Sequence, residues 1–441
     1  MMSRNRSAII ALVAFSVCGL PAAARAQQPR AADSLRLNDL QDRAVQHDPR
    51  TRQLELLSSQ SALRMRDISA SRLPTVGANA QGQYQSQVVT LPLQLPNGLS
   101  FPLPPHDTYD AHVGVQQPIY DPTVGARRGV ERAQLAASEA GVQASTFALR
   151  QSVNEAYFSA LLQQAQGAEQ ESAITDLEAK RKVAASRVAQ GAALASETEM
   201  LDAELLRRRQ AVAQLAAGRD ASLVVLSDLT GQAITSADAL TLPDLNAEVA
   251  RARSSMDTLR ARPEYEQFAR SRDVLTQQQA SLGAADLPRV SAFGRAGYGR
   301  PGLNPLSQEF SNYWLAGVEV EWTPWNWGTT KRDREVLALQ TQIVATSEAA
   351  FRHSVQRGIA RDVASIDQLA QALADDDTIV ALREKILRET GFRFSEGVIT
   401  SSEYVDRETD LLDARLARAT HRVQLAQARA NFLTSLGLGV N

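Results

Sequence analysis

The ionisable residues of this sequence form no recognisable catalytic or metal-binding pattern. The five histidines, at positions 47, 106, 112, 353 and 421, lack the short, regular spacing of metal ligands. The sequence contains no nucleophile elbow, no phosphate-binding glycine loop and no zinc-protease helix motif. Paired carboxylates are frequent, but they lie in long helical segments that provide no substrate cleft. We therefore expect that the protein is not an enzyme and binds no cofactor or metal.

The charged residues favour neither a cation site nor a nucleic-acid partner. The run Asp375 to Asp377 could bind a cation, but a charge run on a helix is more often a solvated face or a local loosening. The formal net charge is −2, whereas a nucleic-acid-binding protein needs a basic face that neutralises phosphates. We therefore expect no nucleic-acid partner.

Two acidic stretches repeat each other about two hundred residues apart. They read RVAQGAALASETEMLDAELL at 187–206 and RFSEGVITSSEYVDRETDLL at 393–412. Each contains a glycine, Gly191 or Gly397, and then a Ser-Glu pair that can start a new helix. The pairs are Ser196-Glu197 and Ser402-Glu403. Each stretch is therefore interpreted as the tip of a hairpin of two helices, and its first-turn glutamate is stabilised by the helix dipole.

Long helices must position these tips. No proline occurs between Pro122 and Pro243, or after Pro324, and both blocks are rich in Ala, Leu, Gln, Glu and Arg. Apolar residues in the blocks recur at steps of three, four and seven, which is the spacing of packed helices. We predict long hairpins over 124–231 and 328–437, each with a first arm of roughly 65 residues, or about 100 Å.

Four short segments show a two-residue period instead. In 311–323 the even positions are apolar or small, as at Trp314 and Val318, while Glu319 and Glu321 occupy odd positions. This alternation predicts strands with one apolar face and one polar face. The four strands cover about 75–90, 108–119, 289–300 and 311–323.

The two halves of the chain resemble each other beyond the hairpins. Residues 47–53 match 261–267, and residues 114–128 match 317–331. Such self-similarity predicts a tandem structural repeat. We expect a signal peptide over 1–26, a first repeat over 27–245 and a second over 246–441.

The N-terminal segment has the features of an export signal. Two arginines precede an apolar run, and a small-residue cleavage site ends at Ala26. Its removal would take away three arginines, change the formal charge from −2 to −5, and remove the only cysteine, Cys18. Lipid attachment at Cys18 is the less favoured alternative, because the residue before it, Val17, is not small. The rest of the chain has no apolar run of 18 residues that would predict a membrane-spanning helix.

Strands with one apolar and one polar face are typical of an outer-membrane barrel wall. Four strands cannot close a barrel, and open edges are not tolerated in lipid, so two or more chains must share one barrel. All four tryptophans lie in or just after the last strand, where aromatic rings favour the membrane interface. They are Trp314, Trp322, Trp325 and Trp327. For Trp325 and Trp327, ordinary packing between strand and helix remains an alternative.

The order of helices, strand pair and long hairpin, given twice, resembles the TolC-type outer-membrane factor family. The R-x-x-x-G…S-E turn in both halves and the glycines that open the long helices, Gly125 and Gly328, carry the same resemblance. The resemblance implies a mainly α-helical protomer with a transmembrane β part, built from tandem long α-hairpins plus four β-strands. It implies a homotrimer whose twelve-stranded β-barrel is continuous with a periplasmic α-barrel. The four strands predicted for one chain agree with this number, because three chains would contribute twelve.

The same resemblance implies where residues of the mouth lie. Glu403 and Asp406, six and nine residues beyond the turn glycine, would ring the periplasmic aperture, with Glu197 as the equivalent in the first repeat. Three copies of each carboxylate around a narrow pore would favour cations. Phe394 and Ile399 depart from the polar residues of the family, so we expect the polar lock to be missing or altered and closure to depend on apolar packing that includes Val398.

The hairpin tips would dock a periplasmic adaptor. The tip residues are Arg187, Gly191, Ser196, Arg393, Gly397 and Ser402. The expected function is the exit duct of a tripartite efflux or type I secretion system in the outer membrane of a Gram-negative bacterium, in contact with lipid and extending into the periplasm. An inner-membrane pump of RND or ABC type would supply the cargo. The alternatives are a stand-alone porin, which needs no helical hairpins, and a periplasmic coiled-coil scaffold, which needs no strands suited to lipid.

Overall fold

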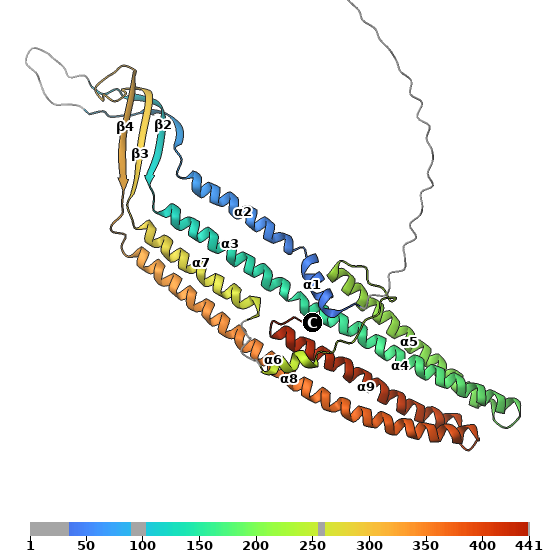
Figure 1. Ribbon diagram of the computed structural model, residues 1–441. Coiled ribbons are helices and arrows are strands. Elements are labelled where there is room, and N and C mark those ends of the chain that lie inside the picture. The colour runs from blue at the N-terminus through green and yellow to red at the C-terminus, as the bar shows by residue number, and fades with distance from the viewer. Residues whose placement is uncertain (1–34, 90–102, 255–260, 440–441) are drawn as a thin grey trace, which may run out of the picture.

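The structure, a computed structural model, describes residues 35–89, 103–254 and 261–439. The molecule is elongated, with a small β-sheet at one end and two helical hairpins at the other (Figure 1). The expected signal peptide lies outside the described residues. The prediction of a mainly helical chain with four antiparallel strands is confirmed.

The elements follow one another in the same order in both halves of the chain. The first half contains α1 (Leu37–His47), α2 (Thr51–Ala70), β1 (Thr75–Tyr84), β2 (Asp107–Tyr120), α3 (Thr123–Phe147), α4 (Leu149–Ala189) and α5 (Ala195–Thr230). The second half contains α6 (Asn246–Ser254), α7 (Pro263–Ala285), β3 (Arg289–Arg300), β4 (Ser311–Glu321), α8 (Thr329–Ser395) and α9 (Ser401–Ser435). Across the described ranges, no helix has the length and apolar character needed to cross a membrane.

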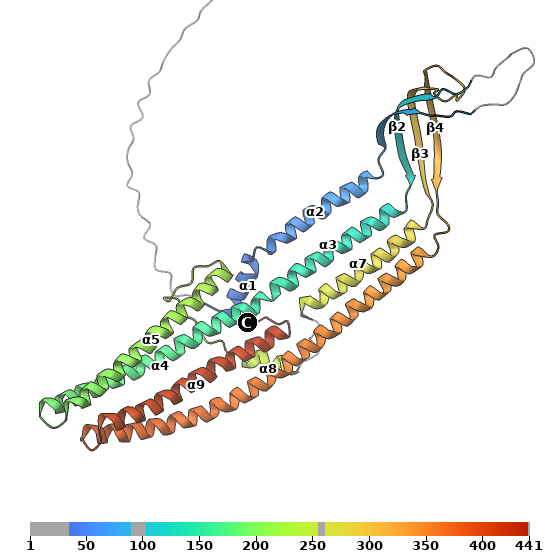
Figure 2. The same cartoon turned by 180° about the vertical axis from the view of Figure 1, so that it is seen from behind.

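The helices form a layer that is four helices wide along most of its length. Below the sheet the order across the layer is α2, α3, α7 and α8, and toward the tips it is α5, α4, α9 and α8 (Figures 1 and 2). Helix α8 has 67 residues and runs through both parts. The main core lies where α1, α4, α5, α6 and α9 meet, around Tyr157, Phe158 and Phe432. A second core lies at the tips.

The first strand is shorter than the sequence predicts. It ends at Tyr84 rather than near residue 90, and one further backbone hydrogen bond follows, from Gln85 N to His106 O at 2.7 Å. Its partner β2 begins only at Asp107, with His106 between this residue and the prolines at 104 and 105. Proline has no N–H to donate, so these positions cannot extend the ladder.

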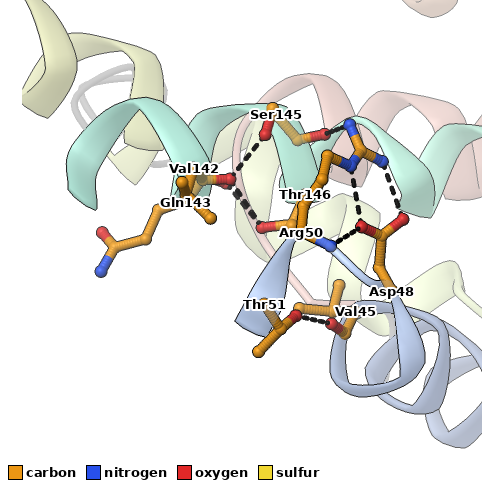
Figure 3. Close-up of polar contacts among 8 residues, drawn as sticks. All are labelled: Val45, Asp48, Arg50, Thr51, Val142, Gln143, Ser145 and Thr146. Carbon is orange, nitrogen blue, oxygen red and sulfur yellow. Dashed lines mark hydrogen bonds and ion pairs between the residues drawn. The ribbon is translucent and has the colours of Figure 1, made fainter. Parts of the chain in front are cut away.

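The first arm of the first hairpin is also divided, at Ala148 between α3 and α4, whereas α8 is continuous. Ser145 and Thr146 donate side-chain hydrogen bonds back to Val142 O, at 2.8 and 3.0 Å. Arg50 Nη1 donates to Ser145 O at 3.1 Å (Figure 3). Hydroxyl groups that bond back to the preceding turn bend helices, and the guanidinium binds a carbonyl near the break. The first arm of the first hairpin therefore consists of two helices, α3 and α4, whereas the first arm of the second hairpin is the single helix α8.

Candidate functional site: strand wall and hairpin tips

The sheet presents one apolar face formed by all four strands. The strands pair in the order β1-β2-β3-β4, all antiparallel. One row across the sheet joins Ala78, Val113, Ala296 and Trp314. Directly paired residues point to the same side of a sheet, so the row lies on one face. The apolar side chains on this face are exposed, Trp314 to 75%.

The opposite face of the sheet is polar. His112 Nδ1 lies 2.6 Å from Asp110 Oδ2, and the Tyr313 hydroxyl donates to Asp110 from the fourth strand. Arg295 occupies the same face, in the strand between them. Four short strands thus separate an apolar surface from a polar one, with the polar groups paired across strands.

Aromatic side chains mark both ends of the apolar face. Trp322, Trp325 and Trp327 follow β4 at the end that joins the helices, and Trp325 packs edge-on against Trp327 at 5.9 Å between centroids. At the loop end, Phe310 stacks on Tyr298 and Tyr109, with centroids 5.4 and 6.0 Å apart. The sequence predicted the tryptophans as interface residues but not this second group, although its tyrosines occur at strand ends within the alternating pattern.

The two hairpin tips have the same backbone. Gly191 and Gly397 take φ values of 72° and 76°, a left-handed conformation that favours glycine. The residue after each glycine donates to the carbonyl of the motif arginine, Ala192 N to Arg187 O at 2.8 Å and Val398 N to Arg393 O at 2.9 Å. This six-residue bond is the Schellman helix end, and it accounts for the repeated spacing from arginine to glycine.

Arg187 ties the first tip to the second. Its Nη1 donates to Phe394 O at 3.1 Å, and its guanidinium lies 6.0 Å from the centre of the Phe394 ring. A Cβ on Gly397 would lie 2.5 Å from Arg187 Nη2, so the arginine occupies the space that the glycine leaves. Arg393, its counterpart in the repeat, is exposed. The two motif arginines therefore share a backbone role and differ in what their side chains do.

Glu197 makes a second contact between the tips. Its Oε2 accepts a hydrogen bond of 2.5 Å from Ser401 N, at the first residue of α9. Thr400 Oγ1 accepts from Glu403 N at 3.3 Å and caps the same helix. Glu403 itself is exposed, as are Asp406, Ser196 and Ser402. Glu197 thus satisfies a free N–H group of the other hairpin, as the dipole of a helix N-terminus favours.

The apolar residues at the second tip are divided between core and surface. Phe394 is fully buried and packs on Tyr404 at 5.1 Å between ring centroids, and Ile399 is buried in the same cluster. Val398 is 65% exposed. The tips are therefore joined by apolar packing at Phe394 and Ile399, and also by polar contacts from Arg187 and Glu197 that the sequence did not predict.

A buried ion pair connects the hairpins further from the tips. Arg208 of α5 donates from Nη2 to Glu408 Oε2 of α9 at 2.5 Å, and both side chains are almost completely buried. Burial, opposed by Arg208 and reinforced by the nearby Glu204 carboxylate, raises the pKa of Glu408 to about 7. This pair could not be predicted from the sequence, because its members come from different repeats and periodicity does not specify which residues pair between repeats.

No metal site is formed within the ranges that the structure describes, since no three His, Cys, Asp or Glu side chains come together there. The Asp375 to Asp377 run is divided among different neighbours. Asp376 Oδ2 lies 2.6 Å from His421 Nδ1, and Asp377 lies 3.7 Å from Arg418.

The fold is that of outer-membrane channel proteins. The structure matches an outer membrane protein of Vibrio cholerae, VceC, with a TM-score of 0.65 and 18% identity over 92% of this chain and 97% of that one. It matches the open Neisseria gonorrhoeae MtrE channel with a TM-score of 0.63 and 19% identity, over 92% and 90% of the two chains. It matches the Campylobacter jejuni CmeC outer membrane channel with a TM-score of 0.64 and 14% identity, over 92% of this chain and 86% of that one.

The resemblance to TolC-type outer-membrane factors is thereby confirmed at the level of the fold. No protein-family model matches the sequence, and no curated protein matches it either. The similarity is therefore one of three-dimensional structure.

Proposed function

We propose that this chain is an outer-membrane channel-tunnel, the passive exit duct of a tripartite efflux or type I secretion system. The observation that carries the proposal is the sheet, which is apolar and exposed on one face, polar on the other, and joined to a layer of long helices. An apolar outer face and a polar inner face are what a barrel wall in lipid requires. Strands of 10 to 14 residues are long enough to span a bilayer.

Closure of the barrel requires further copies of the chain. Within the described sheet, β1 and β4 each have a neighbour on one side only, and open strand edges are not tolerated in lipid. The outer helices of the layer likewise carry exposed apolar side chains on both flanks. These are Leu56 and Leu63 of α2, Leu206 and Val224 of α5, and Leu339, Ile343, Leu382 and Ile386 of α8. Three copies joined flank to flank would form a twelve-stranded barrel and a helical tube below it.

The tips would form the periplasmic mouth and the docking surface for an adaptor protein. Glu403 and Asp406 are exposed near the start of α9, so three copies of each could place negative charge around the aperture. Arg187 and Glu197 would hold the mouth closed by joining the two tips of each chain. Similarity to proteins named as outer-membrane channels supports this assignment.

The experiment is to extract the full chain from outer membranes and reconstitute it in planar bilayers. A duct gives channels, and a periplasmic scaffold gives none. Pull-down of a periplasmic adaptor then separates the duct from a porin. Binding should be lost when Gly191 or Gly397 is replaced by a bulky residue, and channels that bind no adaptor would support the porin alternative.

A further inference from the structure

A groove of about 560 Å³ lies among the helices below the sheet, far from the hairpin tips (Figure 1). Its lining comes from four helices, α2, α3, α7 and α8. Packed neighbouring helices lie about 8 to 10 Å apart, so the outer two helices of a flat layer four helices wide would be roughly 30 Å apart. One groove can touch all four helices only if α2 and α8 rise on the same side of the α3–α7 pair. The groove therefore lies on the concave face of the layer.

A second groove, of about 470 Å³, marks the opposite face of the same layer, and its lining comes from α3 and α7 alone. On α3 this second groove is lined by Gly129 and Ala136, whereas the first is lined by Arg127 and Glu131. Successive helical residues are rotated by about 100°, so these two sets lie on opposite sides of α3. Only the first groove is also bounded by the outer helices.

The concave face continues from the polar face of the sheet. Arg289 lies on that polar face, because six residues separate it from Arg295 in the same strand. Arg289 is within electrostatic reach of Asp121, and Arg127 Nη2 donates a hydrogen bond of 3.2 Å to Asp121 Oδ2. Arg127 in turn lines the groove. A tube closed by joining α8 of one copy to α2 of the next has its concave faces inside, so the groove would open onto the lumen.

The groove combines an apolar lining with an excess of negative charge. The apolar side chains are Ile68, Val130, Leu282, Val336 and Leu337. Glu131 is 8% exposed, and its Oε2 lies 3.7 Å from Arg64 Nη1. Asp333 is exposed and forms no ion pair within the part of the chain that the structure describes. The single arginine of the lining, Arg127, is bonded to Asp121 instead, so Asp333 stays uncompensated.

We infer that this inner-wall groove binds an apolar organic cation, such as a phosphonium or quaternary ammonium ion with hydrocarbon substituents. The apolar lining would bury the hydrocarbon groups, and Asp333 and Glu131 would attract the positive centre. The volume is within the range of small-molecule sites, about 300 to 1,000 Å³. An apolar anion of the same size would meet the same two carboxylates and bind less well. The inference rests on the proposed function, since the concave face is an inner wall only in a closed tube.

The test measures protection of a cysteine in the groove of the full-length chain, reconstituted in lipid vesicles. Val336→Cys places a thiol in this groove, at a side chain that is 50% exposed. Thr276→Cys places a thiol in the groove on the opposite face and is the matched control. A neutral maleimide labels each thiol, and mass spectrometry of the peptide that carries it follows the rate. Tetraphenylphosphonium should slow labelling several-fold in Val336→Cys and leave the rate unchanged in Thr276→Cys.

The role of charge is tested with a second ion and two further variants. Tetraphenylborate has the shape of tetraphenylphosphonium and the opposite charge, so it should protect Val336→Cys much less. Added to Val336→Cys, Asp333→Asn should weaken the protection by tetraphenylphosphonium about fivefold, as loss of one partly exposed ion pair would. Asp273→Asn, in the opposite groove, should not change it. Equal protection by the two ions, or equal affinity in the two aspartate variants, would overturn the cation site.

The remaining outcomes separate the groove from the duct. A thiol at position 336 that stays unreactive without any added ion shows that a second copy of the chain covers the groove, which overturns the inference. Channels in which tetraphenylphosphonium never slows the labelling of Val336→Cys contradict the cation site alone. Protection in a chain that never conducts in planar bilayers contradicts the proposed function, and the groove is then a cation site on a chain that forms no duct.

Discussion

Gly397 of the second tip lies against Arg187 of the first, so that a Cβ on the glycine would stand 2.5 Å from Arg187 Nη2. Gly191 has the same left-handed backbone, yet nothing lies within 4 Å of its Cβ position. The two glycines are alike in conformation and differ in surroundings. One pair of substitutions can therefore separate backbone strain from the contact between tips.

Gly191→Ala should lower the free energy of unfolding by about 1 to 2 kcal/mol, because an L-residue is strained in this left-handed conformation. Gly397→Ala should cost more, because Arg187 must also move away from Phe394 O. We expect Gly397→Ala to lower the melting temperature further and to raise the conductance of the closed channel, as measured by calorimetry and in bilayers. Equal effects of the two variants on conductance would show that Arg187 does not hold the tips together.

Glu197 and Glu403 should respond differently to loss of charge. Glu197→Gln weakens the cap on Ser401 N, and caps of this kind contribute about 1 kcal/mol. It should loosen the tips and raise the open fraction with little change in ion selectivity. Glu403→Gln should lower cation selectivity and leave the open fraction unchanged, because its exposed side chain faces solvent. Reversal potentials measure the selectivity, and single-channel recordings measure the open fraction. A change of selectivity in Glu197→Gln together with a change of open fraction in Glu403→Gln would contradict these assignments.

The buried pair predicts unequal losses of stability. Arg208→Met leaves Glu408 buried without its cation, whereas Glu204 keeps its ion pair with Arg207, and an uncompensated buried charge costs about 3 to 5 kcal/mol. Glu408→Gln leaves Arg208 paired to Glu204 and should change the melting temperature much less at neutral pH. Thermal melts of the detergent-extracted protein compare the two variants. A larger loss for Glu408→Gln would refute this account of the pair.

The raised pKa of Glu408 also sets a direction for stability against pH. The folded chain holds this proton up to about pH 7, while the ordinary value is 4.5, so the folded state binds more protons between them. The contribution of Glu408 to the free energy of unfolding is present at low pH and is lost as the pH rises through about 7. Melts across this range should therefore show a smaller fall for Glu408→Gln than for the wild type.

The two faces of the sheet should tolerate charge differently. Val318→Arg places a cation on the apolar face, which costs about 2 to 4 kcal/mol near the middle of a bilayer. Gln116→Arg places the same side chain on the polar face and should be accepted. The amount of folded protein recovered from outer membranes should fall for the first variant and stay level for the second. Equal recovery would argue against lipid on the apolar face.

Local patterns in the sequence predicted the repeated elements well. Two-residue alternation arises within a single strand and does not depend on distant contacts. It therefore predicted the third strand at 289–300, where the structure has it. The arginine-to-glycine spacing predicted both helix ends, because one hydrogen bond within six residues fixes that geometry. The absence of proline allowed α8 to run through 67 residues.

Contacts between repeats could not be predicted in the same way. The hydrogen bond from Ser401 to Glu197 joins residues 204 positions apart, and no periodicity specifies it. Near the break at Ala148, Arg50 reaches Ser145 O from the turn between α1 and α2, 95 positions earlier in the chain. Such features follow from how the hairpins pack, and packing depends on distant parts of the chain.

The most direct test of the shared barrel is the mass of the particle extracted from outer membranes, measured by native mass spectrometry in a mild detergent. The exposed flanks and unpaired strand edges predict a particle of three chains that withstands dilution. A monomeric particle, or recovery of the chain only in the periplasmic fraction, would contradict a barrel wall contributed by three copies.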